Sequence, residues 1–133
     1  MARLVVYVRS SFCPDVWRWQ RWLSQHPVEH VEFDIDRDEE AYAKVLAWTG
    51  HESVPTLVIA PDDGVDPIEP PAPLPGRSPR AIDRGSMLTE PNPGQVEAFL
   101  DRWGIPYGES AEGGDEVAAG GDKPWWKKVL DGA

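Results

Sequence analysis

Short apolar runs alternate with segments of helical periodicity along residues 4–104, and this alternation constrains the fold more than any other feature. Apolar runs at residues 4–8, 31–35 and 57–59 are typical of strands, the second with a period of two. Apolar residues at helical spacing follow the first two runs, over residues 14–25 and then to about residue 49. This order favours an α/β sheet with crossover helices on its faces.

The helix boundaries have local signals. Pro14 suits the first position of a helix, and Asp36 with Glu39 three residues later resembles a capping box for the second helix. A short strand is expected at residues 81–83, followed by a turn at Gly85. Asn92 then caps a third helix that Gly104 closes, so we expect four strands and three helices.

We divide the chain into one domain over residues 1–106 and two further segments. Residues 61–80 contain seven prolines, which predicts an extended insertion on the surface of that domain. Residues 107–122 are rich in glycine and acidic residues, typical of a flexible linker. Residues 123–133 carry two adjacent tryptophans and three lysines, and we expect this motif to dock onto protein.

The composition narrows the range of possible binding partners and cellular compartments. The formal net charge is −10, which disfavours nucleic acid and anionic membranes as ligands. No apolar run approaches the ~20 residues that span a bilayer, and the first residues lack the pattern of a signal peptide. With one cysteine, no internal disulfide can form. We therefore expect a cytoplasmic protein in a reducing compartment.

Cys13 is the candidate reactive group, because it immediately precedes Pro14 at an expected helix start. Unpaired amides and the helix dipole favour a thiolate there. Arg9 and Arg18 add positive charge, whereas Asp15 opposes it. The alternative is a small buried side chain, the commonest role of a free cysteine. No pair of histidines has metal-ligand spacing together with Cys13, so no metal site is expected.

A second signal is the Val54-Pro55 step at the entry to a strand. If that peptide bond is cis, the backbone of Val54 can pair with an extended peptide. By itself this pattern is weak. With a Cys-Pro step about forty residues earlier and strands and helices between them, it becomes fairly specific.

These pieces together resemble the glutaredoxins, through LVVYVRSSFCPDV, VEFDID, TGHESVPTLVIA and the glycine turn DRGS. The resemblance covers about residues 1–60 and 81–104. It implies a thioredoxin/glutaredoxin fold with a four-stranded mixed sheet flanked by three helices, and Cys13 as nucleophile. It also implies glutathione or a similar small thiol as cosubstrate, with no tightly bound cofactor. The residues that would bind it are Arg9, Pro14, Ser53, Val54, Pro55, Gly85 and Ser86.

The sequence departs from the family pattern at functional positions. Val16 stands where a dithiol glutaredoxin has its second cysteine, and Cys-Pro-Asp-Val differs from the Cys-Gly-Phe-Ser of members that bind iron–sulfur clusters. Met87-Leu88 follow the glycine turn in place of an acidic residue. The leading hypothesis is a monothiol thiol–disulfide oxidoreductase acting on protein disulfides or glutathionylated proteins. The alternative is a non-catalytic thioredoxin-fold module that binds a protein partner.

Overall fold

The computed structural model describes residues 2–108, where five strands form one mixed sheet with three helices. The elements in chain order are β1 (Ala2–Val8), α1 (Pro14–Gln25), β2 (Val31–Asp34), α2 (Glu39–Thr49), β3 (Thr56–Pro61), β4 (Ile82–Asp83), β5 (Met87–Thr89) and α3 (Pro93–Arg102). The strand order is β2-β1-β3-β5-β4. Only the β1–β2 pair is parallel among these neighbours. The predicted α/β class is confirmed.

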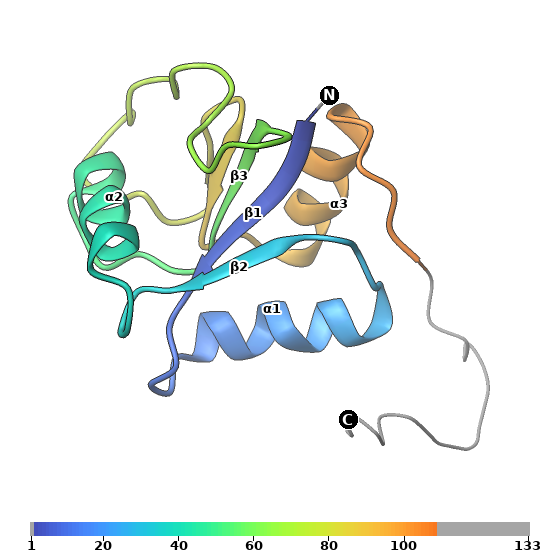
Figure 1. Cartoon of the computed structure of the whole chain (residues 1–133), viewed down its shortest axis with the longest axis horizontal. Helices are drawn as coiled ribbons and strands as arrows, with labels where there is room; N and C mark the ends of the chain where they lie inside the picture. The colour runs from blue at the N-terminus through green and yellow to red at the C-terminus, as the bar shows by residue number, and fades with distance from the viewer. Residues whose placement is uncertain (1, 109–133) are drawn as a thin grey trace.

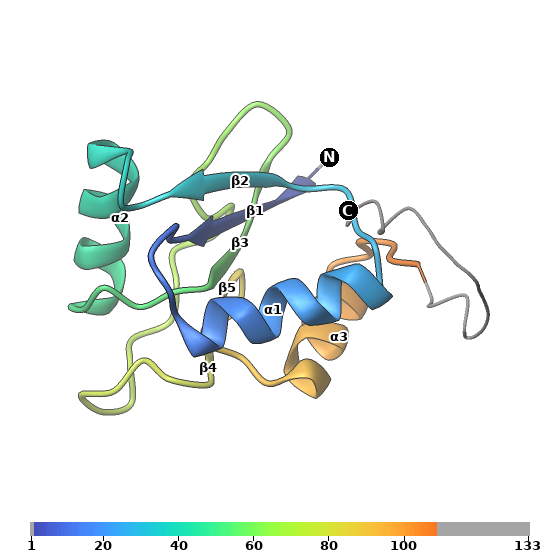
Figure 2. The ribbon, with the colours of Figure 1, turned by 90° about the horizontal axis from the view of Figure 1, so that it is seen from below.

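Helices cover both faces of the sheet. Helices α1 and α3 lie together on one side and α2 lies on the other (Figures 1 and 2). The Trp22 indole on α1 donates to Glu97 on α3 over 3.2 Å. Strands β1 and β3 are central and paired on both sides, so their apolar runs are buried almost throughout. The core therefore lies between this central pair and the three helices.

The sheet has five strands where four were expected. The short strand expected at residues 81–83 is β4, at the edge, and the additional strand is β5. Three residues are too few to show a period in the sequence. They form a strand because β3 and β4 pair with them on either side, with Thr89 opposite Thr56.

The helix starts are close to those predicted. Helix α1 begins at Pro14, and Asn92 and Gln95 form a capping box at α3. The cap of α2 is Asp38, whose carboxylate accepts the N–H of Ala41, so the expected role of Asp36 is wrong. Asp36 instead accepts hydrogen bonds from Ser11, which belongs to a distant loop.

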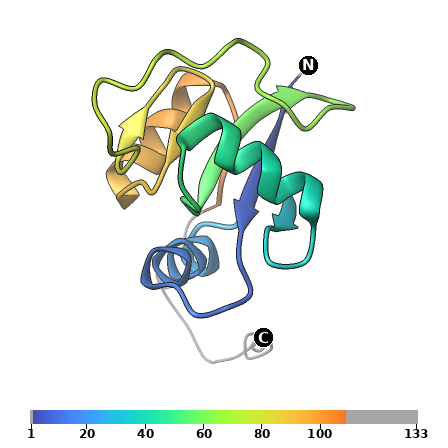
Figure 3. The same ribbon diagram turned by 90° about the vertical axis from the view of Figure 1, so that its left-hand side faces the viewer.

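The proline-rich insertion is fastened to the domain at several points as it arches past α2 (Figures 1 and 3). The Tyr7 hydroxyl donates to the Val65 carbonyl over 2.7 Å, and Lys44 pairs with Asp66 at the same distance. Further along, the buried Arg84 donates to the Ala72 carbonyl. Side chains of the sheet and of α2 thus determine the path of a segment that has no periodic signal.

The described chain ends beside the C-terminal end of α1. Tyr107 packs on the rings of Trp22 and His26, and the N–H of Gly108 donates to the Pro27 carbonyl. The expected linker beyond Gly108 and the motif at residues 123–133 lie outside the described residues. Across residues 2–108, no helix has the length and apolar character needed to cross a membrane.

Candidate active site

Cys13 is the N-cap of α1. Its backbone is extended (φ −148°, ψ 119°), and its carbonyl accepts the N–H of Trp17 over 2.9 Å. The side chain makes no capping hydrogen bond, is partly exposed, and packs against the edge of the core. Pro14 has no N–H, so the amides of Asp15 and Val16 are those left without an intrahelical partner. The sulfur therefore belongs to the residue at the positive end of the helix dipole and is partly exposed to solvent.

Two aromatic side chains near Cys13 are exposed. Phe12 is 84% exposed and Trp17 is 53% exposed, in contrast to the buried Trp19 and Trp22. The guanidinium of Arg21 lies 5.5 Å from the centre of the Trp17 ring. The apolar surface beside the thiol is thus open to a partner rather than part of the core.

Arg9 joins the loop before Cys13 to two other loops. Its guanidinium lies 3.0 Å from Asp36 and 3.2 Å from Glu52. Asp36 also accepts the backbone N–H of Ser11, and these hydrogen bonds, that of Ser11 first, hold the pKa of its carboxyl well below the usual range. Arg9, expected to bind ligand, is therefore paired with carboxylates and fixes the loop that carries the cysteine.

A second charged cluster occupies the first turn of α1. Arg80 binds Asp15 through two contacts, Nη1–Oδ2 at 2.8 Å and Nη2–Oδ1 at 3.0 Å, and also binds Glu90 at 2.8 Å. Arg18 binds Asp15 from the same helix at 2.7 Å. Burial opposes ionisation of Asp15, but the hydrogen bonds from Arg80 and Arg18 outweigh it and lower the pKa of the carboxyl. Burial raises the pKa of the Glu90 carboxyl.

The Val54–Pro55 peptide bond is cis. Tyr7 lies opposite Thr56 in the β1–β3 pair, so this step lies at the end of the sheet from which the chain leaves β1 toward Cys13. Ser53 and Val54 are almost completely buried. Val54 precedes the first paired residue of β3, so its backbone lies outside the strand ladder.

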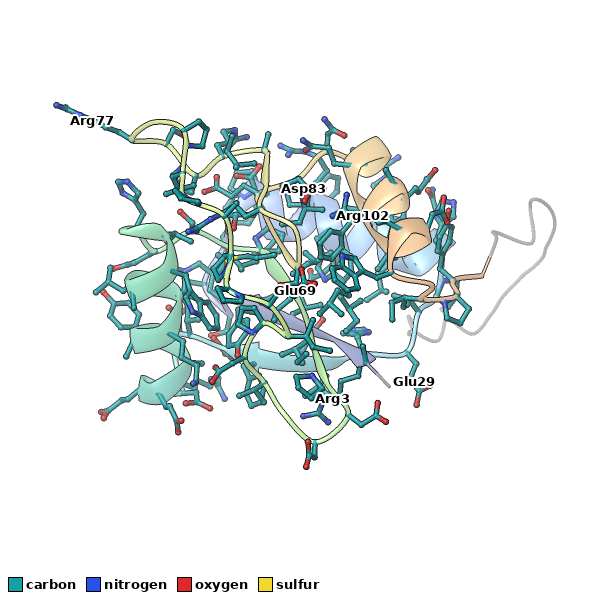
Figure 4. All side chains as sticks on the ribbon, turned by 90° about the horizontal axis from the view of Figure 1, so that it is seen from above. Arg3, Glu29, Glu69, Arg77, Asp83 and Arg102 are labelled. Carbon is teal, nitrogen blue, oxygen red and sulfur yellow. The ribbon has the colours of Figure 1, made fainter. Side chains whose placement is uncertain are left out.

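Gly85 and Ser86 do not lie at this end of the sheet. They form the turn between β4 and β5, and Val58 opposite Met87 places that turn beyond the far end of the β3–β5 pair. Ser86 is fully buried and its hydroxyl donates to the Glu69 carbonyl. The Gly85 carbonyl accepts from Arg102, which also pairs with Asp83, and Figure 4 shows these two side chains together.

The structure thus does not bring Gly85 and Ser86 to the end of the sheet where Cys13 lies. Thr89 and Glu90 occupy that end, and the Glu90 N–H donates to the Pro55 carbonyl over 2.8 Å. We expected the glycine turn at Gly85 to lead directly into α3, because strand β5 was not predicted. The structure instead places β5 between that turn and α3. Glu90 adopts a positive φ of 46°, a conformation that glycine adopts more easily.

Sequence reasoning also missed Arg80 and Glu90 as neighbours of the α1 start. Arg80 lies 65 residues from Asp15 in the sequence, and no local pattern connects them. A cavity of about 170 Å³ lies against α2, and none of the expected site residues lines it. Among residues 2–108, no group of three or more His, Cys, Asp or Glu side chains could hold a metal ion.

The strand order, the helices on both faces, and a cysteine capping α1 near a cis-proline define a thioredoxin-like protein. Residues 4–63 match the family model described as Glutaredoxin. The chain is a glutaredoxin-like protein of the thioredoxin superfamily, a family of thiol–disulfide oxidoreductase-like proteins. Neither the curated proteins nor the solved structures include one that matches this chain. The match includes Cys13 but ends before Arg80 and Glu90.

Proposed function

We propose that this protein is a monothiol thiol–disulfide oxidoreductase that acts through Cys13 on mixed disulfides with a low-molecular-weight thiol such as glutathione. The observation that supports this most is the placement of the sulfur, partly exposed at the N-cap of α1 and making no capping hydrogen bond. Helix-terminal amides stabilise a thiolate in that position. The single cysteine restricts the chemistry to one thiol.

Thiol–disulfide exchange proceeds in two balanced steps. The Cys13 thiolate attacks the small-thiol sulfur of a mixed disulfide, forms a new S–S bond with it, and releases the protein substrate as a thiolate. A second small thiolate then attacks the Cys13 mixed disulfide, regenerates the Cys13 thiolate, and leaves as a small-molecule disulfide. Over the two steps one free small thiol is consumed, the protein sulfur is reduced to a thiol, the two small-thiol sulfurs leave joined as a disulfide, and the enzyme ends unchanged.

An internal disulfide is not available to this site. Val16, the residue at the usual place of a second cysteine, is buried on the inner face of α1. A mixed disulfide on Cys13 therefore persists until an external thiol attacks it. This requires a reducing compartment with abundant small thiol, and we propose the cytoplasm.

We propose that the small thiol lies along Ser53, Val54 and Pro55, with the Val54 backbone paired to its extended peptide. The position of Val54 outside the strand ladder supports this. Pro14 contributes by starting the helix directly after the cysteine. Arg9 contributes by fixing the preceding loop through Asp36 and Glu52.

The test exposes the full chain to oxidised glutathione and measures the intact mass. We expect one glutathione on Cys13 of the wild type, none on Cys13→Ser, and loss of the adduct when reduced glutathione is added. A second assay measures release of glutathione from a glutathionylated protein. Cys13→Ser should abolish this turnover while changing the free energy of unfolding by less than about 1 kcal/mol, because the side chain is only partly buried.

A wild-type protein that forms no adduct and alkylates slowly would refute the oxidoreductase proposal. That result would favour the non-catalytic binding module, in which the exposed Phe12 and Trp17 side chains contact a protein partner. Turnover by Cys13→Ser equal to that of the wild type would exclude Cys13 as nucleophile.

A further inference from the structure

The start of α1 carries an acidic residue where a thiolate is needed. Asp15 lies in the first turn of α1, two residues after Cys13. A carboxylate in that turn interacts favourably with the helix dipole but repels a neighbouring thiolate. Glu90 is a second carboxylate nearby, because Arg80 pairs with both Asp15 and Glu90. Two carboxylates therefore lie in the cluster at the start of the helix that Cys13 caps.

Arg80 supplies positive charge to this cluster from the end of the proline-rich insertion. Its guanidinium binds both carboxylates, whose side chains are only 13% (Asp15) and 15% (Glu90) exposed, while its own side chain is 54% exposed. Arg18 is the other cation on Asp15. The charged groups of the neighbouring loops, Arg9 with Asp36 and Glu52, form a separate cluster of one cation and two carboxylates.

The backbone holds Arg80 in this position independently of its ion pairs. The N–H of Ala81 donates to the Thr89 carbonyl on β5 over 2.9 Å, and the Gln95 side chain on α3 donates to the Ala81 carbonyl over the same distance. Ala81 has a positive φ of 58°, which turns the chain where the insertion rejoins the sheet. These backbone hydrogen bonds of Ala81 thus place the Arg80 guanidinium beside Asp15.

We propose that Arg80 is a positioning residue for Cys13: by pairing with Asp15 and Glu90 at the start of α1, it allows the thiolate to form there. The proline-rich insertion, of which only the first residues fall within the family match, then contributes to the reactive centre. This proposal rests on the proposed function for its biological meaning. Its physical content, the ionisation of one sulfur, can be measured without any disulfide substrate.

The first experiment measures the rate of Cys13 alkylation by iodoacetamide as a function of pH for the full chain. Arg80→Met should move the midpoint of the profile to higher pH and slow alkylation at neutral pH by about two- to fivefold, the range that a partly exposed ion pair produces. Arg80→Lys keeps the charge and should restore most of the rate. Arg77→Met is the matched control, because Arg77 lies in the same insertion and points away from the domain (Figure 4).

A double-mutant cycle with Asp15→Asn separates charge from structure. If Arg80 acts by neutralising Asp15, the effect of Arg80→Met shrinks once the carboxylate is gone. High salt should also reduce the difference between wild type and Arg80→Met, because the Arg80 guanidinium and the Cys13 side chain are both partly exposed. A general loosening of the fold would reproduce neither result.

The proposal is overturned if Arg80→Met alkylates with the wild-type pH profile, or if its effect is equal with and without the Asp15 charge. Failure of the oxidoreductase proposal has a different signature. In that case the wild type forms no adduct with oxidised glutathione, whereas the alkylation profiles still report whether Arg80 influences the sulfur.

Discussion

Replacing Arg84 with methionine tests whether side chains of the sheet hold the insertion. Arg84 is only 9% exposed, and in the described part of the chain it has no carboxylate partner. Its Nε donates to the Ala72 carbonyl and its Nη1 to the Trp48 carbonyl, both at 2.6 Å. One guanidinium thus joins the insertion, the end of α2 and the β4–β5 hairpin.

The magnitude follows from these two contacts. Each hydrogen bond from a charged donor contributes ~1.5 kcal/mol or more, and each carbonyl that loses its donor keeps its desolvation cost. Burial lowers the pKa of Arg84, because the low-dielectric surroundings disfavour its charge, and this cost offsets part of the gain. Methionine preserves most of the apolar stem. We expect Arg84→Met to lower the free energy of unfolding by about 2 kcal/mol and the melting temperature by roughly 10 °C.

Urea unfolding of the full chain measures the stability change, and hydrogen exchange locates it. Faster exchange is expected in the insertion and at the end of α2, with the central strands changed only in proportion to global stability. Arg77→Met is again the control and should leave both measurements unchanged. A stability within about 0.5 kcal/mol of wild type, with unchanged exchange at Ala72, would refute the reasoning.

Two further predictions concern local interactions. The hydrogen bond with Glu32, above all, raises the pKa of His30 over its usual value, so the pair stabilises the fold most below the unfolded-state pKa of about 6.5 and loses this contribution as pH rises through the folded-state pKa. His30→Asn should therefore cost more stability at acidic than at alkaline pH, by less than about 1 kcal/mol; a cost independent of pH would contradict this. Asn92→Ala removes the cap of α3 and should cost about 1 kcal/mol in urea unfolding, whereas the same stability as wild type would show that the capping box is dispensable.

Much of the secondary structure could be predicted because its signals are local. Pro14 fixes the start of α1 and so makes Cys13 its N-cap, whatever the rest of the chain does. Asn92 and Gln95 are three residues apart and form their capping box within one turn. The apolar runs at residues 4–8 and 57–59 predicted strands, and these strands, β1 and β3, lie in the centre of the sheet.

The errors arose where the outcome depends on distant partners. Asp36 and Asp38 are both acceptable N-caps of α2 by sequence. Asp38 caps the helix in the structure, because the Asp36 carboxylate binds the loop at Ser11. Strand β5 has too few residues to be recognised without β3 beside it. Because of this omission Gly85 and Ser86 were expected beside Cys13, whereas Thr89 and Glu90 lie at that end of the sheet.

The sequence by itself determined the order of strands and helices and the position of one sulfur at a helix start, because backbone preferences act over three or four residues. Only the tertiary structure decided which charged side chains meet at the start of that helix. Arg80 and Asp15 are 65 residues apart, and their contact exists because sheet pairing and the anchored end of the insertion bring them together. Contacts between residues so far apart depend on how the whole chain folds, and no short segment of the sequence predicts them.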